Sequence, residues 1–175
     1  SFQQEDKTES ESLCKKGFGL VHNVPTNGII AGQSYLRSTL SSNTGNVVWK
    51  DKTAISFTFD KGSAKQAYPS SQMGAIALLR QTLYDAKWYS NANQKDYNIS
   101  LEALNEALKG KVVFKGSDAK EVLRAHKIIE EFGLDAFYLG GGDEYKFAEE
   151  LKNKNVKLIL PLAYPQAYNV TDPYV

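Results

Sequence analysis

The side chains that could hold a metal or transfer protons are few and far apart in this sequence. Its only histidines are His22 and His126, and its only cysteine is Cys14. A catalytic zinc site needs about three converging protein ligands. We predict His22 within a strand and His126 in the middle of a helix, so the two are not expected to share a metal. We expect His22 to be hydrogen-bonded, His126 to lie on the surface, and Cys14 to form no internal disulfide.

The run Gly140-Gly141-Gly142, followed by Asp143, is a candidate anion site. A glycine-rich turn before a helix can hold a phosphate, because its backbone N–H groups and the helix dipole point at the anion. The spacing matches neither a P-loop nor a dinucleotide-binding fingerprint, and Asp143 would repel an anion. A tight strand-to-helix turn, in which glycines permit positive φ, is the simpler interpretation.

The ends of the predicted strands are the expected place for a ligand. In parallel α/β proteins, ligands bind beyond the carboxyl ends of the strands. Three such ends are predicted, at 115–118, 140–143 and 161–164. We predict Asp118, at the first of these ends, as a substrate-binding residue. Asn27 and Gln33, in the turn-rich segment TNGIIAGQS, complete the predicted substrate-binding set.

The elements that would position these residues alternate in type, and this alternation predicts parallel strands covered by helices. Strands are predicted at 18–24 (buried), 54–59 (at an edge of the sheet), 111–115, 136–139 and 156–160. Helices are predicted at 70–89, 101–108, 118–132 and 143–153. We predict an α/β fold: a partial (β/α)8 TIM-barrel-like domain with parallel strands and alternating helices. It would occupy residues 12–175, after a flexible segment at 1–11.

The composition excludes two classes of partner. The net charge is +1, with 21 basic and 20 acidic residues, so no attraction to nucleic acid is expected. No run of 18 apolar residues exists, so no membrane span is predicted. We expect a soluble protein. The sequence does not determine its compartment, and an exported or periplasmic location is one alternative. The chain starts at Ser1 and its only methionine is Met73, so we expect a processed chain or a piece of a longer protein.

Three segments resemble the imidazolonepropionase-like branch of the amidohydrolase superfamily. The string GFGLVHNVPTNGIIAGQSYLRSTL is similar to a strand and a P-x-x-G-I-x-x-G-x-S loop of that family. ALLRQTLYDAKWY is similar to the long helix that follows, and the β-α-β-α-β stretch from Lys111 to Leu162 is similar to a later part of the barrel. The resemblance covers nearly the whole chain from residue 12, and none of its segments is a catalytic signature.

This resemblance implies a metal-dependent hydrolase of non-peptide C–N bonds on a (β/α)8 barrel, in which a metal makes hydroxide from bound water. The sequence departs from the family's ligand pattern. It contains no H-x-H pair, and it has Lys115-Gly116-Ser117 and Gly140-Gly141 where strand-end histidines are expected. We therefore expect no metal or other cofactor in this segment, and a zinc-like divalent ion only in a full-length protein. Lys115 is either a solvated strand-end lysine or a carbamylated metal ligand.

Three functions remain open at this point. The first is an internal fragment of a metal-dependent amidohydrolase, catalytically incomplete as it stands. The second is a degenerate, non-catalytic barrel half with a scaffold or interaction role. The third is a small-ligand or phosphate-binding module that uses Gly140–Gly142. The expected partner is the remainder of the parent polypeptide. A homo-oligomer is also expected, because an incomplete barrel leaves strand edges that pair with other chains.

Overall fold

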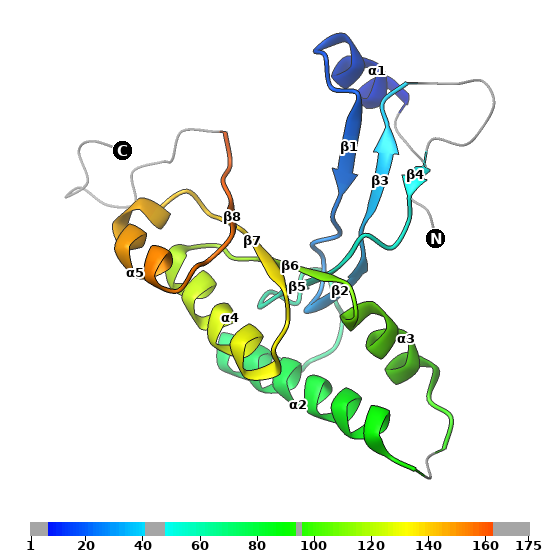
Figure 1. The fold of residues 1–175 in the computed structure, drawn as a ribbon, viewed down its shortest axis with the longest axis vertical. Helices are drawn as coiled ribbons and strands as arrows, with labels where there is room; N and C mark the ends of the chain where they lie inside the picture. The colour runs from blue at the N-terminus through cyan, green and yellow to red at the C-terminus, as the bar shows by residue number, and fades with distance from the viewer. Residues whose placement is uncertain (1–6, 41–47, 94–95, 163–175) are drawn as a thin grey trace.

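The chain forms two β-sheets with helices packed on one of them (Figure 1). The computed structural model describes residues 7–40, 48–93 and 96–162. The strands are β1 (Leu20–Asn23), β2 (Ile30–Gln33), β3 (Tyr35–Ser38), β4 (Val48–Lys50), β5 (Ala54–Thr58), β6 (Lys111–Lys115), β7 (Ala136–Leu139) and β8 (Leu158–Ile159). The helices are α1 (Lys7–Lys15), α2 (Gln72–Asn91), α3 (Ile99–Leu108), α4 (Ala119–Phe132), the 3-10 helix η1 (Glu144–Phe147) and α5 (Ala148–Asn153).

The larger sheet has five strands in the order β2-β5-β6-β7-β8. Strands β5 to β8 are parallel, and β2 pairs antiparallel with β5. The parallel strands are short apolar runs such as KVVFK, as expected where both faces of a strand lose contact with water. Pairing Val113 with Ser56 and Phe137 aligns the three central strands, so their carboxyl ends lie at one edge of the sheet.

Local signals explain where the main helices begin and end. The Ser71 side chain accepts a hydrogen bond from the backbone N–H of Gly74 and starts α2. Asp118 does the same for Glu121 at the start of α4. Both satisfy N–H groups that a helix cannot satisfy itself. Gly133 ends α4 in the left-handed conformation, with φ of 64°, where glycine has no steric penalty.

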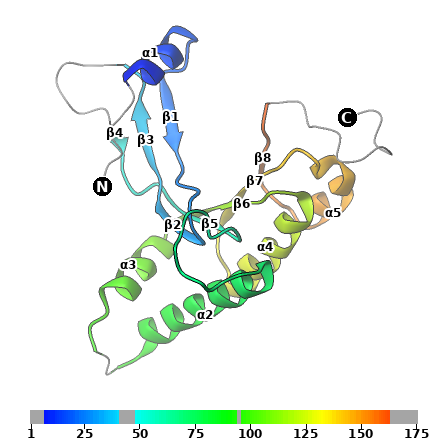
Figure 2. The same cartoon turned by 180° about the vertical axis from the view of Figure 1, so that it is seen from behind.

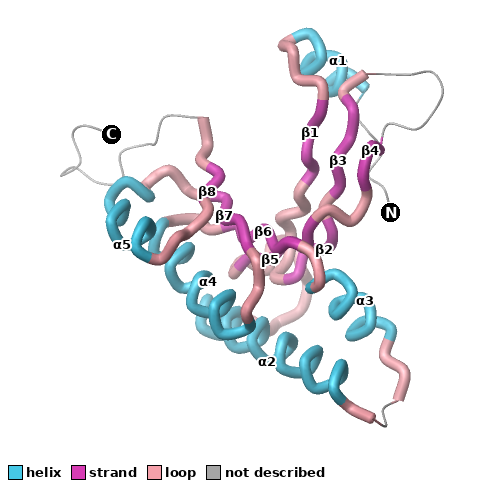
Figure 3. Tube along the Cα trace, in the orientation of Figure 1, coloured by secondary structure: helices cyan, strands magenta, loops and turns pink. Residues whose placement is uncertain are grey.

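The hydrophobic core lies between one face of the larger sheet and helices α2 and α4. Figures 1 and 3 show both helices running along the same side of the strands. Alternate strand residues point into this core, as the pleat of a strand requires. Its fully or nearly fully buried members include Phe57, Leu79, Leu83, Val112, Phe114, Val122 and Tyr138.

The other face of the larger sheet carries no described helix. We call it the helix-free face and define it by Thr58, Val113, Lys115, Phe137, Leu139 and Ile159, which alternate with the core residues on β5 to β8. Val113 is buried, Phe137 and Leu139 are half-buried, and Ile159 is 45% exposed. Burial of this apolar face therefore decreases from β6 towards β8.

The smaller sheet, β1-β3-β4, projects with α1 from the larger one, as both views of the ribbon show (Figures 1 and 2). Arg37 on β3 is buried and donates a hydrogen bond to Ser10 of α1. At the base of this projection, His22 Nε2 lies 2.9 Å from Ser34 Oγ and 2.8 Å from Thr53 Oγ1. These contacts join β1 to the segments that flank β3 and β5.

Several sequence predictions need correction. The predicted buried strand 18–24 is β1, which is only half-buried because it belongs to the projecting sheet. The strand predicted at an edge, 54–59, is β5, which is fully buried between β2 and β6. His126 is buried, not on the surface, and its Nδ1 lies 2.9 Å from the Tyr138 hydroxyl. The prediction that His22 is hydrogen-bonded is confirmed.

Element boundaries also shift. The predicted helix at 143–153 is divided into η1 and α5, and the strand at 156–160 shortens to β8. Helix α1 crosses the predicted boundary between a flexible segment 1–11 and the domain; residues 1–6 lie outside the described residues. Among the described helices, none is long and apolar enough to cross a membrane.

An ion-pair cluster at the amino ends of β6 to β8 gives a pH prediction. Asp135 accepts hydrogen bonds from Lys111 and Lys157, which lower its pKa from 3.8 to about 2. A lowered carboxyl pKa stabilises the fold above the unfolded value and ceases to do so as the pH falls from 3.8 to about 2. In urea titrations at a series of pH values, Asp135→Asn should therefore lose less stability than the wild type across this range. Equal losses would contradict the prediction.

Candidate functional site

The loops that follow β5, β6 and β7 meet at the carboxyl edge of the parallel sheet. We call residues 59–61, 116–118 and 140–143 the carboxyl-end loops. Backbone hydrogen bonds tie two of them to neighbouring strands: Gly116 N donates to Leu139 O at 3.0 Å, and Gly140 N donates to Ile159 O at 3.1 Å. This edge is where parallel α/β folds bind ligands, so it is the candidate site.

The Gly140–Gly142 loop binds a carboxylate of its own chain. Glu144 is 4% exposed, and its two oxygens accept hydrogen bonds from Gly141 N at 2.5 Å and Gly142 N at 2.9 Å. A phosphate would need the same N–H groups. The structure therefore disfavours the phosphate-binding alternative. The interpretation of this run as a tight turn also fits the positive φ of Gly142, 108°.

Close contact between two loops explains why glycine is required at position 141. A Cβ atom there would lie 2.1 Å from the backbone oxygen of Ser117, in the loop after β6. The same two loops are joined by a hydrogen bond at 2.8 Å from Ala119 N to Asp143 Oδ1. Asp143 thus caps the neighbouring helix and not its own, since it makes no capping bond to η1.

A second carboxylate, Glu121, organises the loop after β6. It accepts hydrogen bonds from Ser117 N at 2.7 Å, from Ser117 Oγ at 2.5 Å and from Gln72 Nε2 at 2.5 Å. Arg124 in turn donates to Gln72 Oε1 at 3.1 Å. The arrangement is a capping box extended by one residue, and it links the start of α4 to the start of α2.

A small hollow of about 240 Å³ lies at the carboxyl end of β5 and the start of α2. It is lined by Phe59, Asp60, Lys61, Pro69, Ser70, Ser71 and Gln72. Its charged groups have local partners: Asp60 accepts from Gly62 N at 2.8 Å, and Lys61 donates to Gln66 O at 3.1 Å. The hollow is big enough for a small ligand but offers no convergent set of free polar groups.

The three predicted substrate-binding residues do not converge. Asn27 clamps the loop after β5, with its amide nitrogen 2.7 Å from Ser63 Oγ and its amide oxygen 2.8 Å from Ser63 N. Gln33 pairs with Ile55 near the amino end of β5, away from the carboxyl edge. Asp118 lies at that edge, where its carboxylate caps α4. Asp118 alone therefore combines a strand-end position with a polar side chain.

Lys115, which the sequence analysis left as either a solvated strand-end lysine or a carbamylated metal ligand, lies at this edge. It ends β6 on the helix-free face, in register with Thr58 on β5 and Leu139 on β7. Its side chain is exposed. The alternation in KVVFK contains the signal, because Val112 and Phe114 point into the core and Lys115 must point the other way.

The described residues do not provide the ligands that a metal site of this fold would need. Nowhere in 7–40, 48–93 and 96–162 do three or more His, Cys, Asp or Glu side chains stand where they could hold a metal ion. His22 lies at the base of the projecting sheet. His126 is engaged by Tyr138, whose pKa is raised by burial and by the charge of Glu130. At the ends of β6 and β7, the chain offers an ammonium group and glycines, neither of which fits a zinc site.

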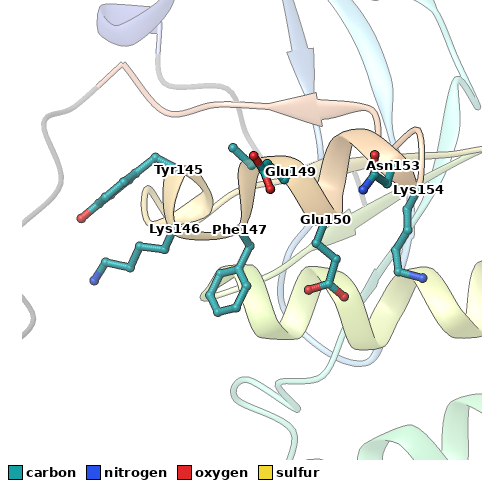
Figure 4. Close-up of a pocket in the computed structure, with 8 residues that line it drawn as sticks. Tyr145, Lys146, Phe147, Glu149, Glu150, Asn153 and Lys154 are labelled. Carbon is teal, nitrogen blue, oxygen red and sulfur yellow. The ribbon is translucent and has the colours of Figure 1, made fainter.

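A larger hollow, of about 740 Å³, lies along η1 and α5, away from the carboxyl ends of β5 and β6. Figure 4 shows Lys146, Glu149, Glu150 and Lys154 on its lining, with side chains that point in different directions. Charges of both signs that do not converge on one point are typical of a solvated helix surface. This hollow carries no site.

Comparison with known proteins bears on the fold. A crystal structure of an amidohydrolase from Thermotoga maritima MSB8 matches the chain with a TM-score of 0.72 at 20% sequence identity. This chain has an amidohydrolase-like fold. The match covers 88% of the chain but 45% of the Thermotoga protein, so the chain spans less than half the length of that neighbour. Neither a protein-family model nor a curated protein matches the sequence.

The amidohydrolase resemblance inferred from the sequence is thus confirmed for the fold, and the imidazolonepropionase-like branch is not distinguished by this match. The α/β class with parallel strands is also confirmed. Closure into a barrel is not seen among the described strands, because β2 and β8 stand at opposite ends of the larger sheet.

Proposed function

We propose that this chain forms one wall of an amidohydrolase-like barrel that hydrolyses non-peptide C–N bonds, of the imidazolonepropionase-like kind. In this proposal the metal ligands come from other parts of a longer parent polypeptide. The observation that supports this proposal is the helix-free face, which is largely apolar. A ligand would bind at its carboxyl edge. The side chains of Leu139 and Ile159 are partly exposed to water, and further strands of a barrel would bury their apolar surface.

The outer side of β8 supports the same proposal. Within the described part of the chain, no strand pairs with the outer edge of β8. The backbone N–H and C=O groups of this edge could therefore form hydrogen bonds with another strand. Next to it lies an apolar hollow of about 510 Å³, lined among others by Leu151, Val156, Leu158 and Leu160. In a βα series, the helix that follows a strand packs beside the preceding helix. One more strand and helix would cover both the edge and the hollow.

A non-catalytic barrel half is the second candidate. It is favoured by two carboxylates that are fully engaged in hydrogen bonds within the chain. The carboxylate oxygens of Glu121 and Glu144 accept hydrogen bonds from N–H and hydroxyl groups of their own loops. Groups held in this way stabilise the loops and are not available as a base or a ligand. On this candidate, the chain supports an active half and contributes no chemistry.

Hydrolysis by the completed protein is the deciding measurement. We expect the 175-residue chain alone to release no ammonia or amine from a panel of cyclic and N-acyl amides, and the completed polypeptide to do so with bound metal. Leu139→Glu should prevent assembly, because it places a charge on the helix-free face; Lys154→Glu on the outer surface is the matched control. Assembly without hydrolysis would support the scaffold candidate, and hydrolysis by the chain alone would contradict both.

A further inference from the structure

We infer that Lys115 provides a positive charge at the carboxyl edge of the helix-free face, and that this position binds the carboxylate of a small organic ligand. The inference rests on the proposed function for the location of the site. It adds the chemical class of the ligand and the residue that recognises it.

The geometry places the ammonium group where a ligand would lie. Lys115 is the last residue of β6, and it points away from the core because Phe114 is fully buried against the helices. Thr58 and Leu139 flank it in register on the neighbouring strands. Thr58 is buried, and its hydroxyl oxygen accepts a hydrogen bond from Asp60 N. Leu139 is half-buried and gives the surface beside Lys115 an apolar part.

The charge of Lys115 is not neutralised by the described residues. No carboxylate among them lies within ion-pair distance of its amino group. The acidic side chains of the same edge accept hydrogen bonds from other groups: Asp60 from Gly62 N, Asp118 from Glu121 N, Glu121 from Ser117, Asp143 from Ala119 N and Glu144 from the glycine loop. The side chain of Lys115 is exposed, so its ammonium group is accessible to an anion from the solvent.

Lys111 is an internal contrast. It stands on the same strand and the same face, four residues earlier, at the amino end of β6. Its amino group is paired with Asp135. The two lysines differ mainly in whether the protein provides the counter-charge. A ligand carboxylate is the natural counter-charge for Lys115, since a charged hydrogen bond is stronger than a neutral one.

Benzoate and benzamide separate the charge from the apolar contact. We expect benzoate to bind the 175-residue chain saturably in NMR titrations, with shift changes at Thr58 and Leu139, and to bind equally well with EDTA present. Benzamide should bind at least about tenfold more weakly, the factor of one charged hydrogen bond. Lys115→Met should weaken benzoate binding by a similar factor, and Lys111→Met should leave it unchanged. Unchanged far-UV circular dichroism and a cooperative unfolding transition verify that both variants fold.

Three results would overturn the inference: equal binding of benzoate and benzamide, benzoate binding that EDTA abolishes, or benzoate binding that survives Lys115→Met. The measurement needs no hydrolysis. Failure of the completed protein to cleave amides would therefore refute the proposed function and leave carboxylate binding intact, while loss of benzoate binding alone would refute only the role of Lys115.

Discussion

Replacing Phe114 with alanine is expected to lower the free energy of unfolding by about 3–5 kcal/mol. Phe114 is fully buried at the centre of the parallel sheet. Its ring centre lies 4.7 Å from that of Phe59 and 6.5 Å from that of Tyr138. The substitution removes apolar burial and leaves a cavity that a β-strand cannot close, because the backbone hydrogen bonds on both sides fix its position.

Urea unfolding followed by circular dichroism measures this loss. Domains of this size are stable by about 5–15 kcal/mol, so the variant should be partly unfolded if the wild type is at the lower end. Phe18→Ala is the matched control, since Phe18 is 52% exposed near the projecting sheet. Exposed substitutions usually change stability by about 0.5 kcal/mol or less. Similar losses for Phe114→Ala and Phe18→Ala would show that the core does not lie where the structure places it.

The second half of the fold follows from sequence because its signals are local. Strands 111–115 and 136–139 were predicted with their observed bounds. Each is a short apolar run, and the helix between them has a capping aspartate at one end and a glycine at the other. Asp118 and Gly133 act within a few residues of their own positions, so no knowledge of the tertiary structure is needed to interpret them.

The projecting sheet was not predicted because its pairings are long-range. β1 pairs with β3, and β3 with β4, across segments that carry turn residues and no clear alternation. Helix α2 shows a related difficulty: Met73 is 80% exposed, whereas Ala75, two positions later, is buried. Apolar residues occur on several sides of this helix, so tertiary contacts decide which side is covered.

The sequence predicted where in the fold the candidate site lies, but not which side chains are free to bind a ligand there. The carboxyl edge is a property of parallel strands, and sequence alternation locates it. Which side chains there remain free depends on contacts between loops. Asn27 was predicted to bind substrate but is occupied by Ser63, a residue 36 positions away. Among the residues that the structure describes, no carboxylate pairs with Lys115, because the nearby acidic side chains accept hydrogen bonds from other groups. These bonds depend on tertiary contacts and cannot be predicted from the local sequence.

Replacing Glu144 with alanine should cost about 3–6 kcal/mol of stability, since hydrogen bonds to a charged group contribute about 1.5–3 kcal/mol each and two are lost. The N–H groups of Gly141 and Gly142 would lose their acceptors in a half-buried loop. Ser117 O prevents Gly141 from moving towards the loop after β6, so the strand-to-helix turn cannot easily rearrange. Urea unfolding of the variant and of the wild type measures the difference.

Glu144→Gln is the matched control, because its amide oxygen can still accept from one of the two glycines. Its loss should lie between those of the wild type and Glu144→Ala. The alanine variant also tests the anion-binding alternative. If the loop were made for phosphate, inorganic phosphate would raise the unfolding midpoint of the wild type. We expect no such rise in the wild type, because the carboxylate of Glu144 already binds the N–H groups that phosphate would need. A phosphate-dependent rise confined to Glu144→Ala would show that this carboxylate takes the place of an anion, whereas a rise in the wild type would contradict the assignment.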